Sequence, residues 1–274
     1  MNFSMNNMMN ALPAILPKPR KKSYDIIEEK MKNIFYHGKK IGFIGLCGGQ
    51  ASGKTKIANY FHKNIPKSAI ISEKDFFKVE KINRKLSSGE EPLIGEYDGY
   101  SKERKILLME LSNPDSYDYD KLNECLEKLE KGEKILLNHF NEETGEIEKD
   151  ANEIDPNKET LIIIEGYFIF ANKQLRDKFD LKLYTEVDDD VRLSRLILRE
   201  NVYIKNNSNA FITFFSIYEK CLKTSFEMNI ETCKKYANII FPNYEIAEDD
   251  EIQIGDDTLE FLLVNLKNIN LSHS

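Results

Sequence analysis

A glycine-rich stretch that directly follows an apolar run constrains this chain more than any other feature. Residues 48–55 read Gly-Gly-Gln-Ala-Ser-Gly-Lys-Thr and match the pattern G-x-x-x-x-G-K-[ST]. Residues 41–46, just before them, are typical of a buried strand, and residues 56–63 are typical of a helix. A strand, a glycine-rich turn and a helix in this order form a loop that cradles phosphates. We therefore expect the chain to bind ATP or GTP.

The residue types within this loop predict how a nucleotide would be held. Backbone amides near the start of the helix would point at the phosphate chain, aided by the helix N-terminus. Lys54 would reach the β- and γ-phosphates, and the Thr55 hydroxyl would hold Mg²⁺. The residues expected to contact the nucleotide are Gly48, Gly49, Gln50, Ala51, Ser52, Gly53, Lys54, Thr55 and Lys56.

Composition narrows the class of protein. The chain has 274 residues, of which 41% are hydrophobic and 31% charged, as in a soluble globular protein with one sizeable core. The net charge of −7 argues against a nucleic-acid partner, since phosphate backbones bind to basic surfaces. Apolar runs are shorter than the ~18–20 residues that a membrane span needs, so we expect no membrane partner.

The cysteines indicate a compartment. Cys47, Cys125, Cys221 and Cys233 show neither C-x-x-C nor metal-ligand spacing. They are typical of free thiols in a reducing environment, so we expect a cytoplasmic protein. Self-association into a homo-oligomer is compatible with these features.

The order of apolar and helical patterns predicts a doubly wound α/β fold with a mostly parallel sheet. Residues 1–38 are expected to be a partly disordered tail with a short helix, and residues 39–270 a P-loop domain. Strands are expected at 40–46, 69–72, 134–140, 161–164, 181–187 and 237–241, and a hairpin-like turn at 141–146. Helices are expected at 56–64, 118–131, 188–200, 210–235 and 258–267.

Two polar segments interrupt this pattern. Residues 78–105 contain several glycines and a proline and are expected to form a long loop or a small lobe. Residues 201–209 are polar and unpatterned, and are either a mobile lid that closes over the nucleotide or an ordinary loop.

In such sheets, ligands bind at the carboxyl ends of the strands, and charged residues follow two of the strands expected here. Glu165 ends the apolar strand and could hold Mg²⁺ opposite Thr55, although a strand-end glutamate can also cap a turn. Asp75, with Glu73 as its substitute, could accept a proton from an attacking hydroxyl, or both could belong to a solvated charge cluster.

The helix expected at 188–200 carries an arginine stripe. Arg192, Arg195 and Arg199 are spaced along one helix face. Such a stripe can clamp transferring phosphate charge or can be a solvated face.

Taken together, these segments resemble the uridine kinase family, the uridine–cytidine kinases, among the phosphoribulokinase-like P-loop kinases. Besides the loop, residues 113–118 resemble H-P-D-x-F-D, and residues 161–166 are similar to its strand ending in Glu-Gly. Residues 190–200 resemble D-x-R-L-x-R-R-x-x-R-D, and residues 235–242 resemble K-Y-A-D-x-I-x-P. The resemblance covers residues 40–242, so the predicted domain is a P-loop kinase with a lid.

The acceptor half departs from the family pattern. Lys74 falls where the family has its catalytic Asp, and Asp75 lies one residue later. Ser112 stands for the sugar-binding Asp, Leu196 for the second of two paired arginines, and Phe140 for a tyrosine. The histidine that follows this tyrosine in the family has no clear counterpart in residues 141–149. The resemblance implies that Phe77, Ser112 and Phe140 contact the acceptor.

The resemblance implies an ATP-dependent kinase that phosphorylates the 5′-hydroxyl of a pyrimidine nucleoside. The expected catalytic residues are Lys54, Asp75, Arg195 and Arg199, with ATP and Mg²⁺ as cofactors. Residues 75–80 also resemble nicotinamide riboside kinases, which makes another riboside an alternative acceptor. Lys74 and the missing acceptor residues leave a catalytically silent nucleotide-binding regulator as a second alternative. A GTPase is disfavoured, because the chain lacks an N-K-x-D motif and the metal carboxylate lies in Glu-Gly.

Overall fold

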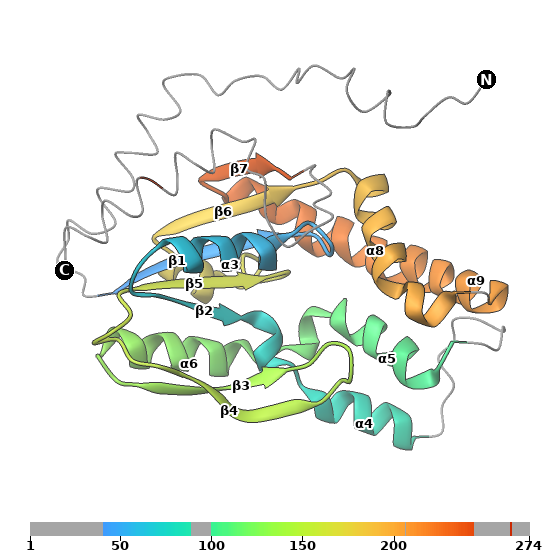
Figure 1. Ribbon diagram of the computed structural model, residues 1–274, viewed down its shortest axis with the longest axis horizontal. Helices are drawn as coiled ribbons and strands as arrows, with labels where there is room; N and C mark the ends of the chain where they lie inside the picture. Colours follow the sequence, from blue (N-terminus) through green and yellow to red (C-terminus); the bar gives the residue numbers. More distant parts are fainter. Residues whose placement is uncertain (1–40, 89–99, 206, 244–263, 265–274) are drawn as a thin grey trace, which may run out of the picture.

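Five parallel strands form the central sheet (Figure 1). The computed structural model describes residues 41–88, 100–205, 207–243 and 264. In sequence order the strands are β1 (Gly42–Gly48), β2 (Ser68–Ser72), β5 (Leu161–Gly166), β6 (Leu181–Glu186) and β7 (Ile239–Pro242). Their spatial order is β2-β5-β1-β6-β7. The predicted α/β class and parallel sheet are confirmed.

Strand β5 lies inside the sheet, between β2 and β1, and its side chains are apolar up to the last two residues. Every residue of β1 and β5 is buried, as expected for parallel strands covered on both faces. In the register, Glu165 pairs with Leu46 of β1 on one side and with Ser72 of β2 on the other. The carboxylate of Glu165 is thereby placed between the ends of two strands, directly beside the glycine-rich loop.

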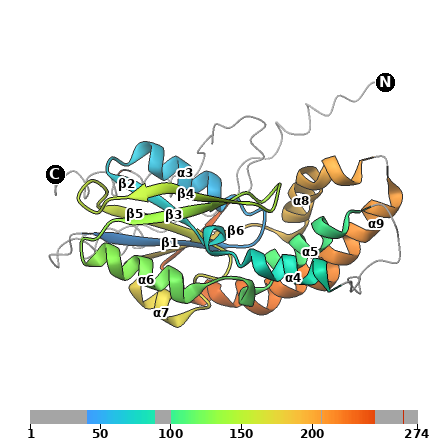
Figure 2. The same cartoon turned by 90° about the horizontal axis from the view of Figure 1, so that it is seen from below.

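Helices cover both faces of this sheet (Figure 2). Helix α3 (Lys54–Asn64) lies on one face, where Ile57, Ala58 and Phe61 pack into a cluster with apolar residues of β1, β5 and β6. On the other face lie α6 (Tyr119–Glu130) and α7 (Lys173–Lys178), which pack into a larger cluster with β1 and β5. The predicted helices at 56–64 and 118–131 are confirmed.

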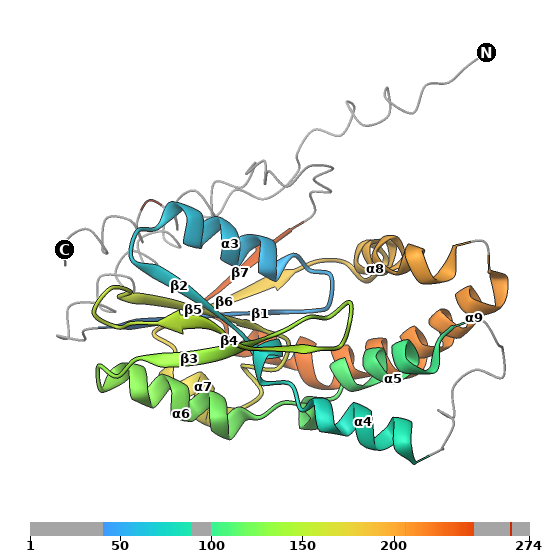
Figure 3. The same ribbon diagram turned by 60° about the horizontal axis from the view of Figure 1, so that its bottom comes forward.

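A separate antiparallel hairpin lies below the sheet, next to α6 (Figure 3). It consists of β3 (Ile135–Phe140) and β4 (Ile147–Ile154). The hairpin-like turn at 141–146 is confirmed, whereas β4 has so many polar residues that the sequence pattern did not indicate a strand. The end of β3 contacts a short 3₁₀ turn, η1 (Glu73–Phe76), that follows β2.

Helices gather beyond the carboxyl edge of the sheet (Figures 1 and 3). They are α4 (Val79–Ser87), α5 (Lys102–Leu111), α8 (Asp189–Ile204) and α9 (Ser208–Ile217). Of the two alternatives for residues 78–105, the long loop is wrong for α4 and the start of α5, whereas these helices agree with a small lobe; residues 89–99 lie outside the described residues. The ordinary-loop alternative for 201–209 is also wrong, because α8 continues to Ile204 and α9 begins at Ser208, and the lid alternative stays a prediction.

The last long helix is less regular than expected. After α9 the chain continues through the wide turns η3 (Tyr218–Lys223) and η4 (Phe226–Ile230) and the 3₁₀ turn η5 (Glu231–Tyr236). Wide helical turns of this kind frequently occur at functional sites.

Some predictions lie outside the described residues, namely the N-terminal tail and, apart from residue 264, the helix at 258–267, and the division into residues 1–38 and 39–270 stays a prediction. All four cysteines are free. Within the described residues, the helices are too short or too polar to cross a membrane.

Candidate active site

The glycine-rich loop adopts a curled conformation around its own lysine. Gly53 precedes α3 with φ at 87°, in the left-handed region that favours glycine. The Lys54 ammonium turns back into the loop and donates hydrogen bonds to the carbonyl oxygens of Gly48 (2.9 Å) and Gly49 (2.8 Å). The Ser52 hydroxyl lies 2.6 Å from the hydroxyl of Thr185 on β6, which fixes the loop to the sheet.

Lys54 is a buried cation beside an aromatic ring. Its ammonium lies 4.2 Å from the centroid of the Tyr167 ring, and its side chain is almost fully buried. Burial lowers the pKa of Lys54 to about 8, although the nearby Glu165 acts in the opposite direction. A phosphate chain entering the loop would restore a full counter-charge to this lysine.

The predicted magnesium ligands lie at two adjoining elements. Glu165 is buried at the end of β5, and one of its carboxylate oxygens accepts a hydrogen bond from the Ser72 hydroxyl at 2.7 Å. Thr55 is exposed in the first turn of α3, immediately after the loop. A hydroxyl and a carboxylate oxygen are hard ligands that suit Mg²⁺, and this ion usually keeps several waters. The donor set therefore fits the ion that was predicted.

Lys74 and Asp75 leave η1 in different directions. The Lys74 ammonium lies 5.7 Å from the centroid of the Tyr167 ring, the same ring that the Lys54 ammonium contacts. Lys74 therefore points toward the phosphate loop. The Asp75 carboxylate accepts a hydrogen bond from the backbone N–H of Phe140 (3.1 Å) and lies 3.4 Å from the His139 ring. Asp75 therefore faces the end of β3, and burial raises its pKa.

Glu73, the substitute base in the sequence-based hypothesis, has structural contacts. Its carboxylate is completely buried and accepts hydrogen bonds from the backbone N–H groups of Tyr167 (2.5 Å) and Phe168 (3.1 Å) and from the Tyr119 hydroxyl (3.0 Å). Burial raises the pKa of Glu73 to about 7, against the effect of these hydrogen bonds. The contacts indicate that Glu73 holds the turn that follows Glu165.

The three arginines of α8 have different partners. Arg192 is buried against the Phe226 ring, with its guanidinium carbon 3.5 Å from the ring centroid, and forms an ion pair with Asp189. Arg195 donates to the backbone carbonyls of Ala51 (3.1 Å) and Asn243 (2.9 Å), at the edge of the phosphate loop.

Arg199 reaches across to the hairpin instead. One of its terminal nitrogens lies 3.2 Å from the Glu142 carboxylate in the β3–β4 turn. Thus Arg195 and Arg199 both flank the site, whereas Arg192 packs α8 against the Phe226 ring.

Glu142 was not singled out from the sequence, yet it lies at the centre of the charged groups. Its carboxylate is 2.5 Å from the Lys74 ammonium, and its backbone carbonyl accepts a hydrogen bond from Arg104 of α5 at 2.8 Å. Lys74 and Glu142 are 68 positions apart, so no local pattern could have indicated this pair.

The residues expected to contact the acceptor are largely inside the core. The rings of Phe77 and Phe140 are both buried, with centroids 4.9 Å apart. The Ser112 hydroxyl bonds to the Met109 carbonyl of its own helix at 2.8 Å. Leu196, in the position of the family's second arginine, is buried in an apolar cluster with residues of α5 and α9. An apolar contact between helices thus replaces a polar group, which explains this departure.

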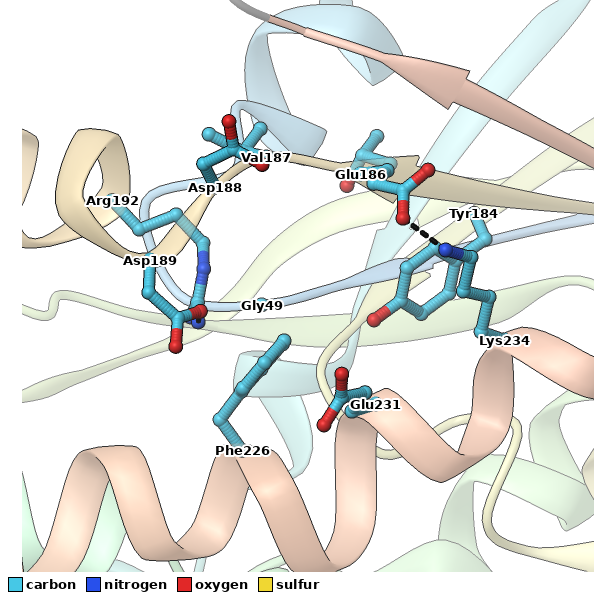
Figure 4. Close-up of a pocket in the computed structure, with 11 residues that line it drawn as sticks. Gly49, Tyr184, Glu186, Val187, Asp188, Asp189, Arg192, Phe226, Glu231 and Lys234 are labelled. Carbon is cyan, nitrogen blue, oxygen red and sulfur yellow. Dashed lines mark hydrogen bonds and ion pairs between the residues drawn. The ribbon is translucent and has the colours of Figure 1, made fainter.

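A cavity of about 250 Å³ lies beneath the phosphate loop (Figure 4). It is lined by Gly49, by the end of β6 and the residues that follow it, and by Phe226 and Glu231, and the ion pair Glu186–Lys234 forms part of its wall. A Cβ atom on Gly49 would lie 2.6 Å from a terminal nitrogen of Arg192. A side chain at this position would displace the Arg192 guanidinium, which is packed directly against the loop backbone.

A buried ion pair ties α5 to α8 at the base of the helical region. Arg104 donates to both carboxylate oxygens of Glu200, at 2.6 and 3.0 Å, and the Tyr100 hydroxyl donates to the same carboxylate at 2.6 Å. The Glu200 side chain is completely buried. This network positions α8, and with it the arginines that flank the site.

Replacing Glu200 with alanine should destabilise the chain by about 3–5 kcal/mol, since Arg104 would keep a buried charge without its carboxylate partner. The free energy of unfolding from urea denaturation would measure the effect. Glu103→Ala, which removes an exposed carboxylate from the same helix as Arg104, should change it by less than about 0.5 kcal/mol. Equal effects of the two substitutions would contradict a structural role for the Arg104–Glu200 pair.

The comparisons agree with this geometry. A family model described as "Phosphoribulokinase / Uridine kinase family" matches residues 43–248. The chain belongs to this family. It is therefore related to kinases that have a P-loop, and the family implies ATP as the phosphoryl donor and a small molecule as the substrate.

Individual relatives in the family are distant. The chain is 30% identical over 207 residues to the uridine kinase of Clostridium novyi (strain NT). This match covers 73% of this chain and 86% of that protein. It is 28% identical over 200 residues to uridine kinase-like protein 5 of Arabidopsis thaliana, covering 73% of this chain. The match spans only 38% of that plant relative.

Solved structures share the fold. A putative fructose transport system kinase from Silicibacter sp. TM1040 superposes with a TM-score of 0.56 at 14% identity, covering 82% of this chain and all (100%) of that chain. A putative P-loop containing kinase with a circular permutation, from Saccharomyces cerevisiae, superposes with a TM-score of 0.51 at 10% identity. That match covers 81% of this chain and 97% of the yeast chain. The chain thus has a P-loop kinase fold.

Proposed function

We propose that the chain transfers the γ-phosphate of ATP to the 5′-hydroxyl of a pyrimidine nucleoside, uridine or cytidine. The observation that carries this proposal is the convergence of Lys54 and Lys74 on the Tyr167 ring, beside Glu165 and the phosphate loop. Phosphoryl transfer needs mainly positioning and charge neutralisation, and this arrangement can supply both. The resemblance to uridine kinases supports the nucleoside as acceptor.

Each group would have a distinct task. Lys54 and the loop amides would hold the phosphates, and Arg195 and Arg199 would stabilise charge on the transferring group. Asp75 would accept the proton of the acceptor hydroxyl from its place at the end of β3. Thr55 and Glu165 would hold Mg²⁺, which, when bound, neutralises charge on the β- and γ-phosphate oxygens.

Two alternatives share the fold. The segment after Asp75 resembles nicotinamide riboside kinases, so another riboside could be the acceptor. A silent nucleotide-binding regulator is favoured by one observation, that Lys74 points toward the phosphate loop while Asp75 points to β3.

An ADP-release assay with Mg·ATP separates these alternatives. We expect uridine or cytidine to stimulate ADP release well above the rate with ATP alone, and mass spectrometry to find the nucleoside 5′-monophosphate. Stimulation by nicotinamide riboside, but not by uridine or cytidine, would identify that riboside as the acceptor, as in the first alternative. ATP binding without stimulation by any of these acceptors would contradict the proposal and favour the regulator.

A further inference from the structure

Two cations of the site converge on one carboxylate of the β3–β4 turn. The Glu142 carboxylate lies 2.5 Å from the Lys74 ammonium and 3.2 Å from the Arg199 guanidinium. These cations come from η1 and α8, so three separate parts of the chain meet at this carboxylate. The Glu142 side chain is only 18% exposed, so the contact is not a loose surface ion pair.

The turn does not need this carboxylate to hold its shape. The Asn141 side chain accepts hydrogen bonds from the backbone N–H groups of Glu143 (2.8 Å) and Thr144 (3.1 Å). The backbone of Asn141 also bonds to Glu146 and Gly145. Because Asn141 closes the turn, the side chain of Glu142 is available to bind groups outside it.

The carboxylate is strongly held as an anion. Burial would raise the pKa of Glu142, but Lys74 and Arg199 outweigh this effect and lower it to about 2. The carboxylate thus neutralises only one of the two cations that contact it in the free chain.

The cluster of Lys74, Arg199 and Glu142 lies close to the lysine of the phosphate loop. The ammonium groups of Lys54 and Lys74 lie over one ring, that of Tyr167, and Lys54 is the residue that pairs with β- and γ-phosphates in such loops. An anion bound between Lys74 and Arg199 therefore lies next to the end of a phosphate chain in the loop. Carboxylates and phosphoryl groups are both oxyanions that these cations bind through charge-assisted hydrogen bonds.

We propose that Lys74 and Arg199 form the site of the terminal phosphoryl group, and that Glu142 occupies this site in the nucleotide-free chain. The proposal rests on the proposed function, because it requires a nucleoside triphosphate in the loop. When ATP binds, the two cations pass from the carboxylate to the γ-phosphate. ADP has no γ-phosphate and leaves the Glu142 contacts in place. Glu142 therefore lowers the affinity for ATP relative to ADP, and Lys74 becomes a phosphoryl-binding residue.

Calorimetry with a non-hydrolysable ATP analogue and with ADP tests this proposal on the full chain. Glu142→Gln removes the competing charge and keeps the side-chain shape. We expect it to raise the affinity for the ATP analogue about tenfold, as for the loss of one charge-assisted contact, and to change the affinity for ADP less than about twofold. Glu142→Asp, which keeps the charge but shortens the reach, should give a smaller gain and serves if Glu142→Gln does not fold.

Glu143→Gln is the matched control, because it removes an equal charge from the neighbouring, exposed residue. It should leave both affinities unchanged. Equal gains for the ATP analogue and ADP in Glu142→Gln, or an unchanged or lower affinity for the analogue, would overturn this proposal alone. If wild type bound neither nucleotide, the proposed function would fail first, and this proposal with it.

Discussion

Replacing Lys54 with alanine should lower phosphoryl transfer by about 10²–10³-fold, the usual loss when one preorganised electrostatic group is removed. The Lys54 ammonium donates to the Gly48 and Gly49 carbonyls in the free chain, and these donors would turn to the phosphates of bound ATP. Alanine offers neither charge nor donor. Calorimetry with Mg·ATP and the ADP-release assay would measure the loss.

The control for this substitution is Lys63→Ala, at an exposed position of the same helix. It removes the same charge far from the loop and should leave binding and turnover as in wild type. Unchanged ATP affinity and turnover in Lys54→Ala would contradict the assignment of residues 48–55 as the phosphate loop.

The low pKa of Lys54 adds a pH dependence to nucleotide binding. With burial holding this pKa at about 8, the free chain carries the charged lysine below pH 8 and loses the charge above it. Phosphates favour the charged form and raise the pKa in the complex, so binding takes up a proton above pH 8. ATP affinity should therefore be constant between about pH 7 and pH 8 and fall above pH 8. In Lys54→Arg the guanidinium stays charged, so whatever affinity remains should not fall in this range.

The parts of the fold that the sequence predicted are those with a local signal. The phosphate loop is a fixed spacing of glycine and lysine, and β5 is a continuous apolar run that ends in a charge. Helix α6 has an apolar stripe and a glycine stop. For each of these elements, neighbouring residues along the chain carry most of the information.

The parts that were missed depend on contacts between distant residues. Arg104 and Glu200 are 96 positions apart, and the polar segment around Arg104 gave no helical signal strong enough to outweigh its glycines. Glu142 lies in a polar turn that any solvated loop would resemble. Its role depends on Lys74, which is brought to it by the contact between η1 and β3. Periodicity cannot report such contacts.

The direction of Lys74 and Asp75 could not be decided from the sequence either. A one-residue shift after β2 would have turned Asp75 toward the phosphates. Instead, η1 directs Lys74 to the loop side and Asp75 to the Phe140 amide. The base assigned to Asp75 stays a prediction, and it now has a defined geometry to test.

Removing the charge of Asp75 should have the second large effect. Asp75→Asn keeps the size of the side chain and its place beside Phe140 but cannot accept a proton. If Asp75 is the general base, this substitution should reduce ADP release with uridine by about 10²–10⁴-fold while ATP affinity stays near that of wild type. Such a split between turnover and binding would distinguish proton transfer from a structural role.

Lys74→Asp tests the opposite assignment in the same assay. In the proposed enzyme, an aspartate at this position would repel both Glu142 and the γ-phosphate, so ATP affinity and turnover should both fall by at least about tenfold. In a silent regulator, wild type would release no ADP in response to uridine, because a lysine with a pKa raised by Glu142 and Tyr167 against the effect of burial cannot accept a proton. Turnover that appears only in Lys74→Asp would show that the chain has the fold of a kinase and lacks only its base.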